Sequence, residues 1–186
     1  MIAIITSEKD PASLNIEEHL LRLHVPHIIT LQEEMIFVEE LDKKEDADLL
    51  IFASKHSSAA NVPSLSVHFP GNWNTAELGG KEKTLCMAAP LYLKEAFLRL
   101  HHYKPELVTL EATHHGPYCN KPCFFIEIGS SLEQWKDKAL GGIIAKTIQG
   151  ITTKKPKQRE IAIGLGGSHY CSNFNRIELE TEIALS

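Results

Sequence analysis

The sequence lacks the features that mark secreted, membrane-spanning and zinc-ribbon proteins. Its four cysteines, at positions 86, 119, 123 and 171, form no CxxC pair, which excludes zinc-ribbon and thioredoxin-like motifs. No basic region precedes the short apolar run at the N-terminus, and no apolar run approaches the roughly 18 residues of a membrane span. We therefore expect free thiols, a reducing cytoplasmic location and no membrane partner.

Basic residues are not in excess. The 19 Lys and Arg residues are outnumbered by 24 Asp and Glu residues, giving a formal net charge of −5. Because the neutralisation of phosphates supplies much of the affinity for duplex DNA, a general DNA-binding protein should be basic. We expect no DNA partner, and any RNA contact should be local.

Short apolar runs alternate with amphipathic segments. The strands that we predict are 2–6, 27–31, 35–38, 49–53, 65–69, 108–112, 123–128, 161–165 and 177–185. Helices are predicted from Asp10-Pro11 to about His24, from Pro90 to about His102, and from a capping box of Ser131 and Gln134 onward. This order predicts an α/β fold, a three-layer sandwich with a mixed sheet, in a single domain over residues 1–186. The last strand ends at Ser186 with no closing helix, so we expect a short or truncated chain.

Polar residues, several of them histidines, follow the predicted strands. In open α/β sheets, sites form beyond the carboxyl ends of the strands, so a common cluster is expected. The alternative is a set of unrelated loop residues. The segments concerned are Lys55-His56-Ser57-Ser58, His68, Thr113-His114-His115-Gly116-Pro117, Glu127 and Gly166-Gly167-Ser168-His169-Tyr170.

The pair His114-His115 is the sharpest local feature. Adjacent residues on a regular strand point to opposite faces, so both can serve one site only if the strand has ended, and Gly116-Pro117 supplies that ending. One histidine could bind a metal or act as a base while the other orients it. A capped turn with one exposed histidine is the alternative.

Glu127 interrupts an apolar strand, where a carboxylate is costly unless it is paired. It could orient a histidine, bind a metal or act as a base with a raised pKa, or it could face water on an edge strand. Glu111 makes a similar but weaker case. The glycines of 164–167 form no dinucleotide fingerprint and indicate either close approach of the backbone to a ligand or a tight turn.

Taken in order, these motifs resemble the D-aminoacyl-tRNA deacylases of the archaeal and plant type. The matching segments span nearly the whole chain and include 52–58, 67–68 with 71–72, 112–117, 127–130 with 135–137, and 166–170. The resemblance implies a phosphorylase- or peptidyl-tRNA-hydrolase-like fold, and hydrolysis of the ester that joins a D-amino acid to the 3′ end of tRNA. It also implies zinc (Zn²⁺) dependence, and members of the family run on for many residues beyond Ser186. Carried over by position, the functional candidates are His56, His68, His114, His115, Glu127 and His169.

From this resemblance we assign provisional roles. His114, His115 and His169 hold or flank the metal, and Glu127 or His56 acts as a base or supports the ligands. The expected catalytic set is His56, His114, His115, Glu127 and His169. The expected substrate contacts are Ser57, His68, Asn72, Gly166, Gly167 and Lys121.

The partner implied is the acceptor end of a tRNA that carries a D-amino acid. Lys81, Lys83 and the basic connector 154–159 join Lys121 as candidate phosphate contacts. Two other functions stay open at this point. One is a zinc peptidase or amidase of related fold, and the other is a non-catalytic RNA-binding module.

Overall fold

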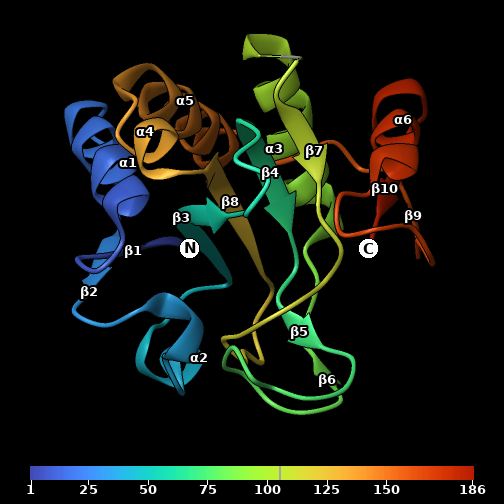
Figure 1. Cartoon of the computed structure of the whole chain (residues 1–186), viewed down its shortest axis with the longest axis horizontal. Coiled ribbons are helices and arrows are strands. Elements are labelled where there is room, and N and C mark those ends of the chain that lie inside the picture. The colour runs from blue at the N-terminus through green and yellow to red at the C-terminus, as the bar shows by residue number, and fades with distance from the viewer. Residues whose placement is uncertain (105) are drawn as a thin grey trace.

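A computed structural model describes residues 1–104 and 106–186. Its centre is a six-stranded sheet in the order β2-β1-β3-β8-β4-β7 (Figure 1). Neighbouring strands are parallel except β4 and β8, which are antiparallel, so the sheet is mixed as predicted. The strands are β1 (Ile2–Ser7), β2 (Ile28–Leu31), β3 (Leu49–Ser57), β4 (Ser64–His68), β7 (Val108–Leu110) and β8 (Cys123–Ser130).

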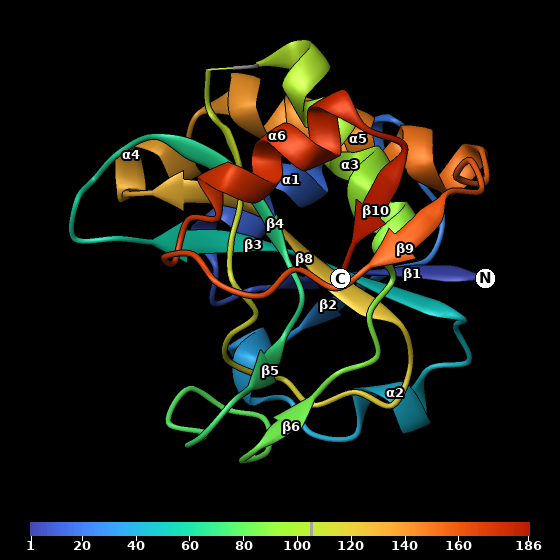
Figure 2. The ribbon, with the colours of Figure 1, turned by 90° about the vertical axis from the view of Figure 1, so that its right-hand side faces the viewer.

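Two further layers enclose this sheet and complete the predicted three-layer sandwich. Long helices cover one face, and short helices with a small hairpin cover the other, as Figures 1 and 2 show. The first layer contains α1 (Pro11–Arg22), α3 (Pro90–Tyr103), α4 (Leu132–Trp135) and α5 (Lys138–Thr153). The second layer contains η1 (Met35–Phe37), α2 (Leu41–Lys44), β5 (Gly71–Asn72) and β6 (Thr84–Leu85). The last part of the chain forms β9 (Glu160–Ala162), α6 (Ser172–Glu180) and β10 (Ile183–Leu185).

The period of two along the central strands separates two apolar cores. On β8, Phe124 and Ile126 pack toward the long helices, whereas Cys123 and Phe125 pack toward the short ones. Because both faces are covered, the central strands are almost continuously apolar. Fully burying one such side chain stabilises the fold by about 1.5–3 kcal/mol.

Aspartates cap two of the long helices. Asp10 Oδ1 accepts hydrogen bonds from the backbone N–H of Ala12 and of Ser13 at 2.8 and 3.0 Å, which starts α1 where predicted. The prediction of one helix from Ser131 is wrong. The Ser131 hydroxyl donates to the side chain of Gln134 and caps no backbone N–H. The helix α4 ends after one turn because the backbone of Asp137 is extended (ψ 112°), and Asp137 caps the separate helix α5.

Three predicted strands differ in the structure. The segment 35–38 forms the 3-10 helix η1, and the strand expected at 161–165 is the shorter β9. The segment 177–185 divides into the end of α6 and the strand β10. Tertiary contacts decide the last case: buried Lys94 donates to the carbonyls of Glu178, Thr181 and Ile183, which ends the helix and turns the chain into β10.

Among the described residues, none of the helices is both long enough and apolar enough to cross a membrane.

Candidate active site

One face of the sheet changes from apolar to polar partway along its strands. On β3 this face presents Phe52 and then Ser54 and His56, and on β8 it presents Phe125 and then Glu127. The register pairs Ser54 with Glu127, so the polar portions of the two strands lie side by side. Strand β3 continues through Ser57, so His56 lies on a strand and not on the predicted loop after it.

The antiparallel strand β4 adds His68 to this face. His68 is paired with Phe125 in the register, and the two rings stack with centroids 5.0 Å apart. Because β4 runs against β8, its carboxyl end lies beside the first half of β8, at Phe125. The site therefore lies on a face of the sheet and not, as predicted, beyond a common edge of strand ends.

Two segments outside the regular strands close over this face. The segment after β7 carries His114 and His115, whose ring centroids lie 4.3 Å apart. His115 has a left-handed backbone (φ 45°), and this turn lets adjacent residues face one cluster. The segment before α6 carries His169, whose carbonyl accepts from the N–H of Ala112 at 2.8 Å.

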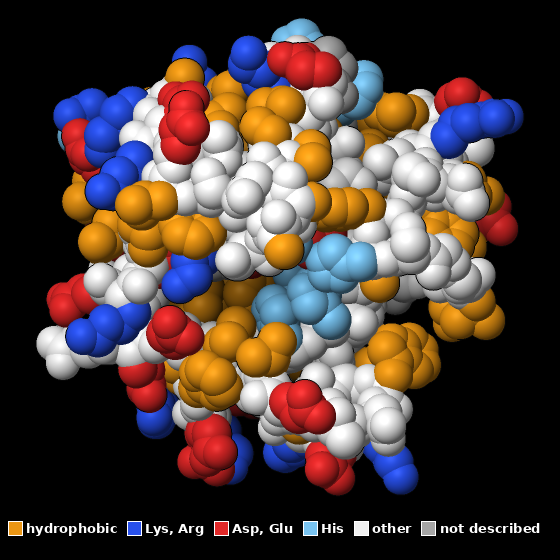
Figure 3. Space-filling view, in the orientation of Figure 1, with side chains coloured by type: hydrophobic (Ala, Val, Ile, Leu, Met, Phe, Trp, Pro, Cys, Tyr) orange, Lys and Arg blue, Asp and Glu red, His pale blue; other side chains and the backbone are white. Residues whose placement is uncertain are grey.

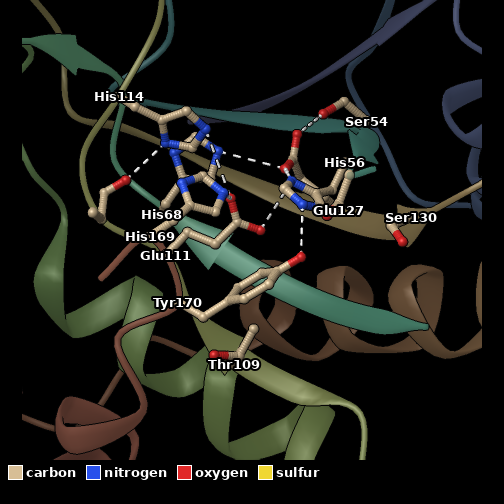
Figure 4. Close-up of polar contacts among 12 residues, drawn as sticks. Ser54, His56, His68, Thr109, Glu111, His114, Glu127, Ser130, His169 and Tyr170 are labelled. Atoms are coloured by element: carbon tan, nitrogen blue, oxygen red, sulfur yellow. Dashed lines mark hydrogen bonds and ion pairs between the residues drawn. The ribbon is translucent and has the colours of Figure 1, made fainter. Parts of the chain in front are cut away.

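Glu111 is the central carboxylate of the cluster. Its side chain is fully buried, and its oxygens lie 3.2 Å from His56 Nδ1, 3.1 Å from His169 Nε2 and 3.7 Å from His114 Nε2 (Figure 4). Burial by itself raises the pKa of Glu111, but His169 and His56 outweigh burial and hold the pKa well below its usual range. Sequence patterns make only a weak case for Glu111, because its pairing with Tyr170 across an isolated bridge has no local signature.

Glu127 has the opposite electrostatic character. Its Oε1 accepts from the Ser54 hydroxyl, and its Oε2 lies 3.5 Å from His68 Nε2 and 3.7 Å from His56 Nδ1. Burial, together with the charge of Glu111, raises the pKa of Glu127 well above its usual value. Two carboxylates with pKa values pushed apart are typical of sites that both take up and donate protons.

Three imidazoles share one hydrogen-bonding pattern. His68 Nδ1 lies 3.1 Å from the carbonyl oxygen of Phe69. His114 Nδ1 lies 2.7 Å from that of Ala112, and His115 Nδ1 lies 2.6 Å from that of Gly116. A carbonyl only accepts, so each Nδ1 donates and each Nε2 keeps a free lone pair. Burial lowers the pKa of His114 to about 3 and of His115 to about 2, and also lowers the pKa of His68, so the metal-free rings are neutral.

These neutral imidazoles suit a bound metal ion. One ligand atom from each of His68, His114 and His115 lies within 4.8 Å of the others, and the described residues provide no hydrogen-bond partner for buried His68 Nε2. Backbone carbonyls that fix the Nδ1–H are the usual support for such ligands. The predicted ligand His169 belongs instead to a second possible group, with His56 and Glu111.

The remaining ring nitrogen of His56, Nε2, lies 2.9 Å from the hydroxyl of Tyr170. The sequence patterns had assigned no role to Tyr170. Burial lowers the pKa of His56, but Glu111 outweighs it and the net pKa is raised. Glu111 likewise raises the pKa of His169, whose side chain is 46% exposed.

Two cavities meet this cluster. Figure 3 shows a patch of histidines in a hollow, with hydrophobic side chains beside it. A cavity of about 330 Å³, here the acidic cavity, is lined by Asp10, Glu34, Met35, Ile36, Ser54, Lys55, His56, Ser57, Leu78, His114, His115, Glu127 and His169. A cavity of about 410 Å³, here the apolar cavity, includes His68, Trp73, Glu111, Gly166, Gly167 and Phe174 among its lining residues.

The substrate contacts predicted from the sequence do not all lie at the two cavities. Ser57 lines the acidic cavity, and His68, Gly166 and Gly167 line the apolar cavity. Asn72 is buried, and its amide donates to the carbonyls of Gly79 and Lys81, so it shapes the loop and is not free to contact a ligand. Lys121 lines neither cavity, because it precedes β8 at the end away from Glu127 and donates to the Glu45 carbonyl.

Together, the three-layer fold and the imidazole–carboxylate cluster define the class: an α/β protein with a site suited to hydrolysis. A family model described as D-aminoacyl-tRNA deacylase matches residues 43–186. A relative named D-aminoacyl-tRNA deacylase, from Pyrococcus furiosus, is 38% identical over all of this chain and 78% of its own length. Another of that name, from Methanoculleus marisnigri, is 36% identical over all of this chain and 44% of its own length. The chain belongs to the D-aminoacyl-tRNA deacylase family.

Solved structures agree with the fold. A crystal structure titled a conserved protein of unknown function covers the whole chain, with 75% of its own chain aligned, a TM-score of 0.94 and 31% identity. An N-acetylmuramoyl-L-alanine amidase of Nostoc punctiforme has a TM-score of 0.50 and 12% identity over 83% of this chain and 98% of its own. At that identity the likeness to the amidase concerns the fold alone, so it does not favour the peptidase or amidase alternative.

Proposed function

We propose that this chain hydrolyses the ester bond of D-aminoacyl-tRNA, releasing a free D-amino acid and tRNA, at the imidazole–carboxylate cluster. One observation carries the proposal. In a chain of this family, His56, His68, His114, His115, His169 and both buried glutamates converge on one face of the sheet. Ester hydrolysis needs an activated water and a proton donor for the leaving oxygen, and this cluster contains groups suited to both tasks.

A zinc ion is the cofactor that this cluster suits best. His68, His114 and His115 would hold it through their free Nε2 atoms, as three neutral nitrogen ligands that leave a position open. When bound, the ion would lower the pKa of a water molecule to near 7 and polarise the ester carbonyl. The ligand set expected from the sequence was His114, His115 and His169. In this assignment His68 takes the place of His169.

Glu127 is the proposed base. Its Oε1 is held by Ser54, and its Oε2 has no hydrogen-bond partner among the described residues, so that oxygen can take a proton from the attacking water. Burial raises the pKa of Glu127 well above its usual value, which suits a carboxylate that must accept and then return a proton.

His169 is the proposed acid, and Glu111 and Tyr170 are positioning residues. Glu111 stabilises the protonated form of His169, and the partly exposed ring lies beside Glu111 at the edge of the acidic cavity, so it can donate a proton to the leaving oxygen of an ester bound at the cluster. Glu111 and Tyr170 together hold both nitrogens of His56 and fix that ring.

We expect selection for the D-amino acid to come from side chains of the acidic cavity that clash with the L-amino acid. A steric clash with the wrong substrate separates the two forms more sharply than one extra contact with the right one.

The substrate is expected to meet the protein at its acceptor end, in the cytoplasm, where charged tRNA is present. The negative net charge favours a small footprint of this kind. Lys81 and Lys83, in the loop that joins β5 to β6, stay candidate phosphate contacts.

The test is deacylation of one D-aminoacyl-tRNA and its L counterpart by the purified chain. We expect release from the D substrate only, and loss of that release in the double variant His114→Ala, His115→Ala. The variant His101→Ala, His102→Ala is the control, because that pair lies at the end of α3 and lines neither cavity. Binding of tRNA without release by the parent chain would favour the RNA-binding module instead.

A further inference from the structure

The apolar cavity has no part in the chemistry described so far. We propose that it binds the terminal adenosine of the tRNA substrate, with the adenine stacked on Trp73. This inference rests on the proposed function, and it adds the orientation of the substrate and a residue that recognises the alcohol side of the ester.

The imidazole–carboxylate cluster forms the wall between the two cavities. Glu111 and His68 line the apolar cavity, whereas His114 and His169 line the acidic cavity. Contacts across the wall are short, since Glu111 Oε2 lies 3.1 Å from His169 Nε2 and the rings of His68 and His114 lie 4.3 Å apart. An ester held at this wall therefore extends its acyl side into one cavity and its ribose side into the other.

The charges of the cavities decide which side goes where. Glu34 lines the acidic cavity with a half-exposed side chain, 3.6 Å from Lys55 Nζ, and its carboxylate suits the α-ammonium group of an aminoacyl ester. Asp10 lines this cavity as well, but its oxygens already accept from backbone N–H groups. Glu111, which belongs to the wall, is the single Asp or Glu that lines the apolar cavity among the described residues, and no described Lys or Arg lines it. An uncharged purine fits such surroundings, whereas an ammonium group finds no free counter-ion there.

The apolar cavity also carries the groups that bind bases. Trp73 is 65% exposed, so its indole face is available, and Phe174 contributes a second ring. Gly166 and Gly167 have φ of 110° and 99°, and a Cβ built on either would meet no atom within 4 Å. The flat edge of a base can therefore approach the bare backbone, as it does where proteins stack single-stranded bases on aromatic side chains.

The placement of Trp73 is fixed by its neighbour. Asn72 is 8% exposed and holds the loop through hydrogen bonds from its side-chain amide to the Gly79 and Lys81 carbonyls. The indole is thus exposed on an anchored loop, which lowers the entropy that stacking would otherwise cost.

The kinetic test compares two esters of one D-amino acid, the 3′-adenosyl ester and the methyl ester. For Trp73→Ala we expect KM for the adenosyl ester to rise about 10-fold with kcat within about twofold, because stacking binds ground and transition states alike. The methyl ester should be cleaved as by the parent, and Trp73→Phe should restore most of the affinity. Phe37→Ala is the matched control, an exposed aromatic that lines neither of the two cavities.

A binding test keeps this inference separate from the proposed function. Adenosine 5′-monophosphate should quench the fluorescence of Trp73 in the purified chain. Its affinity, measured by calorimetry for the parent and for Trp73→Ala alike, should fall at least 10-fold in the variant, whether or not any ester is cleaved. Equal effects of Trp73→Ala on both esters would place the amino acid in the apolar cavity and overturn the inference. Nucleotide affinity unchanged by Trp73→Ala would overturn it as well.

Discussion

Glu111 lies 3.1 Å from His169, although the two residues are far apart in the sequence. The N–H of Ala112 donates to the His169 carbonyl, so the backbones that carry the carboxylate and the imidazole are themselves paired. The same carboxylate reaches His56 through its other oxygen. One buried charge therefore sets the orientation and protonation of two imidazoles.

We predict that Glu111→Gln lowers deacylation about 100-fold or more while the protein stays folded. The amide has the same shape but no charge, so His56 and His169 lose the group that orients and protonates them, an effect of the size seen for general acids and bases. Turnover of a D-aminoacyl-tRNA and circular dichroism measure the two properties. Glu77→Gln, on an exposed loop, is the control, and an activity of Glu111→Gln within threefold of the parent would contradict the prediction.

The second prediction concerns the titration of His169 in metal-free protein. We expect its pKa to lie above the ordinary 6.5, and to fall in Glu111→Gln, because Glu111 raises it. The ion pair stabilises the fold fully at pH values below 6.5, down to the region where Glu111 becomes protonated, and this stabilisation is lost as the pH rises through the folded-state pKa of His169.

NMR titration of the His169 ring, with a chelator present, measures this pKa. A pKa of His169 below the ordinary 6.5, or one that Glu111→Gln leaves unchanged, would show that Glu111 is not its counter-ion.

The architecture of the sheet follows from local patterns, whereas the composition of the site does not. Apolar runs such as 49–53 and 123–128 predicted the central strands, because strands buried on both faces need apolar residues at nearly every position. The Asp10-Pro11 start of α1 was predicted for the same kind of reason, as its cap lies within three residues of the groups it binds.

Long-range contacts account for the errors. The strand predicted at 177–185 became a helix end and β10 because Lys94, far away in the sequence, binds the carbonyls there. In the site, the histidines were found because their residue type is distinctive. Glu111 and Tyr170 were undervalued because their importance arises from contacts with His56 that only the folded chain makes.

The third prediction concerns the metal. We expect Zn²⁺ to raise the melting temperature of chelator-treated protein, because an ion that binds only the folded chain stabilises it by about 2.7 kcal/mol at 100 times its Kd. His68→Ala should abolish most of this shift and His102→Ala should leave it intact. If His68→Ala responds to Zn²⁺ as the parent does, His68 is not a ligand. The same measurement on His169→Ala would then test the set expected from the sequence, His114, His115 and His169.

The last prediction concerns Gly116, which follows the two adjacent histidines. A Cβ at this position would lie 2.3 Å from the Ile36 carbonyl oxygen and 2.4 Å from the Gly80 backbone nitrogen, and neither is the end of a flexible side chain. Gly116→Ala must therefore displace the backbone, at a cost of about 1–3 kcal/mol in the free energy of unfolding. The displacement also moves His115, whose Nδ1 lies 2.6 Å from the Gly116 carbonyl, so deacylation and Zn²⁺ binding should weaken together.

The matched control is Gly142→Ala inside α5, where a Cβ would make only ordinary contacts 3.6 Å from the His19 ring. Alanine in place of glycine within a helix should stabilise the protein by about 0.5–1 kcal/mol. The two substitutions add the same methyl group, so opposite changes in melting temperature would isolate the close backbone approach at Gly116 as the cause. If Gly116→Ala instead keeps the melting temperature and the Zn²⁺ affinity of the parent, the segment 113–117 is not held against Ile36 and Gly80, and its two imidazoles are positioned by something other than this packing.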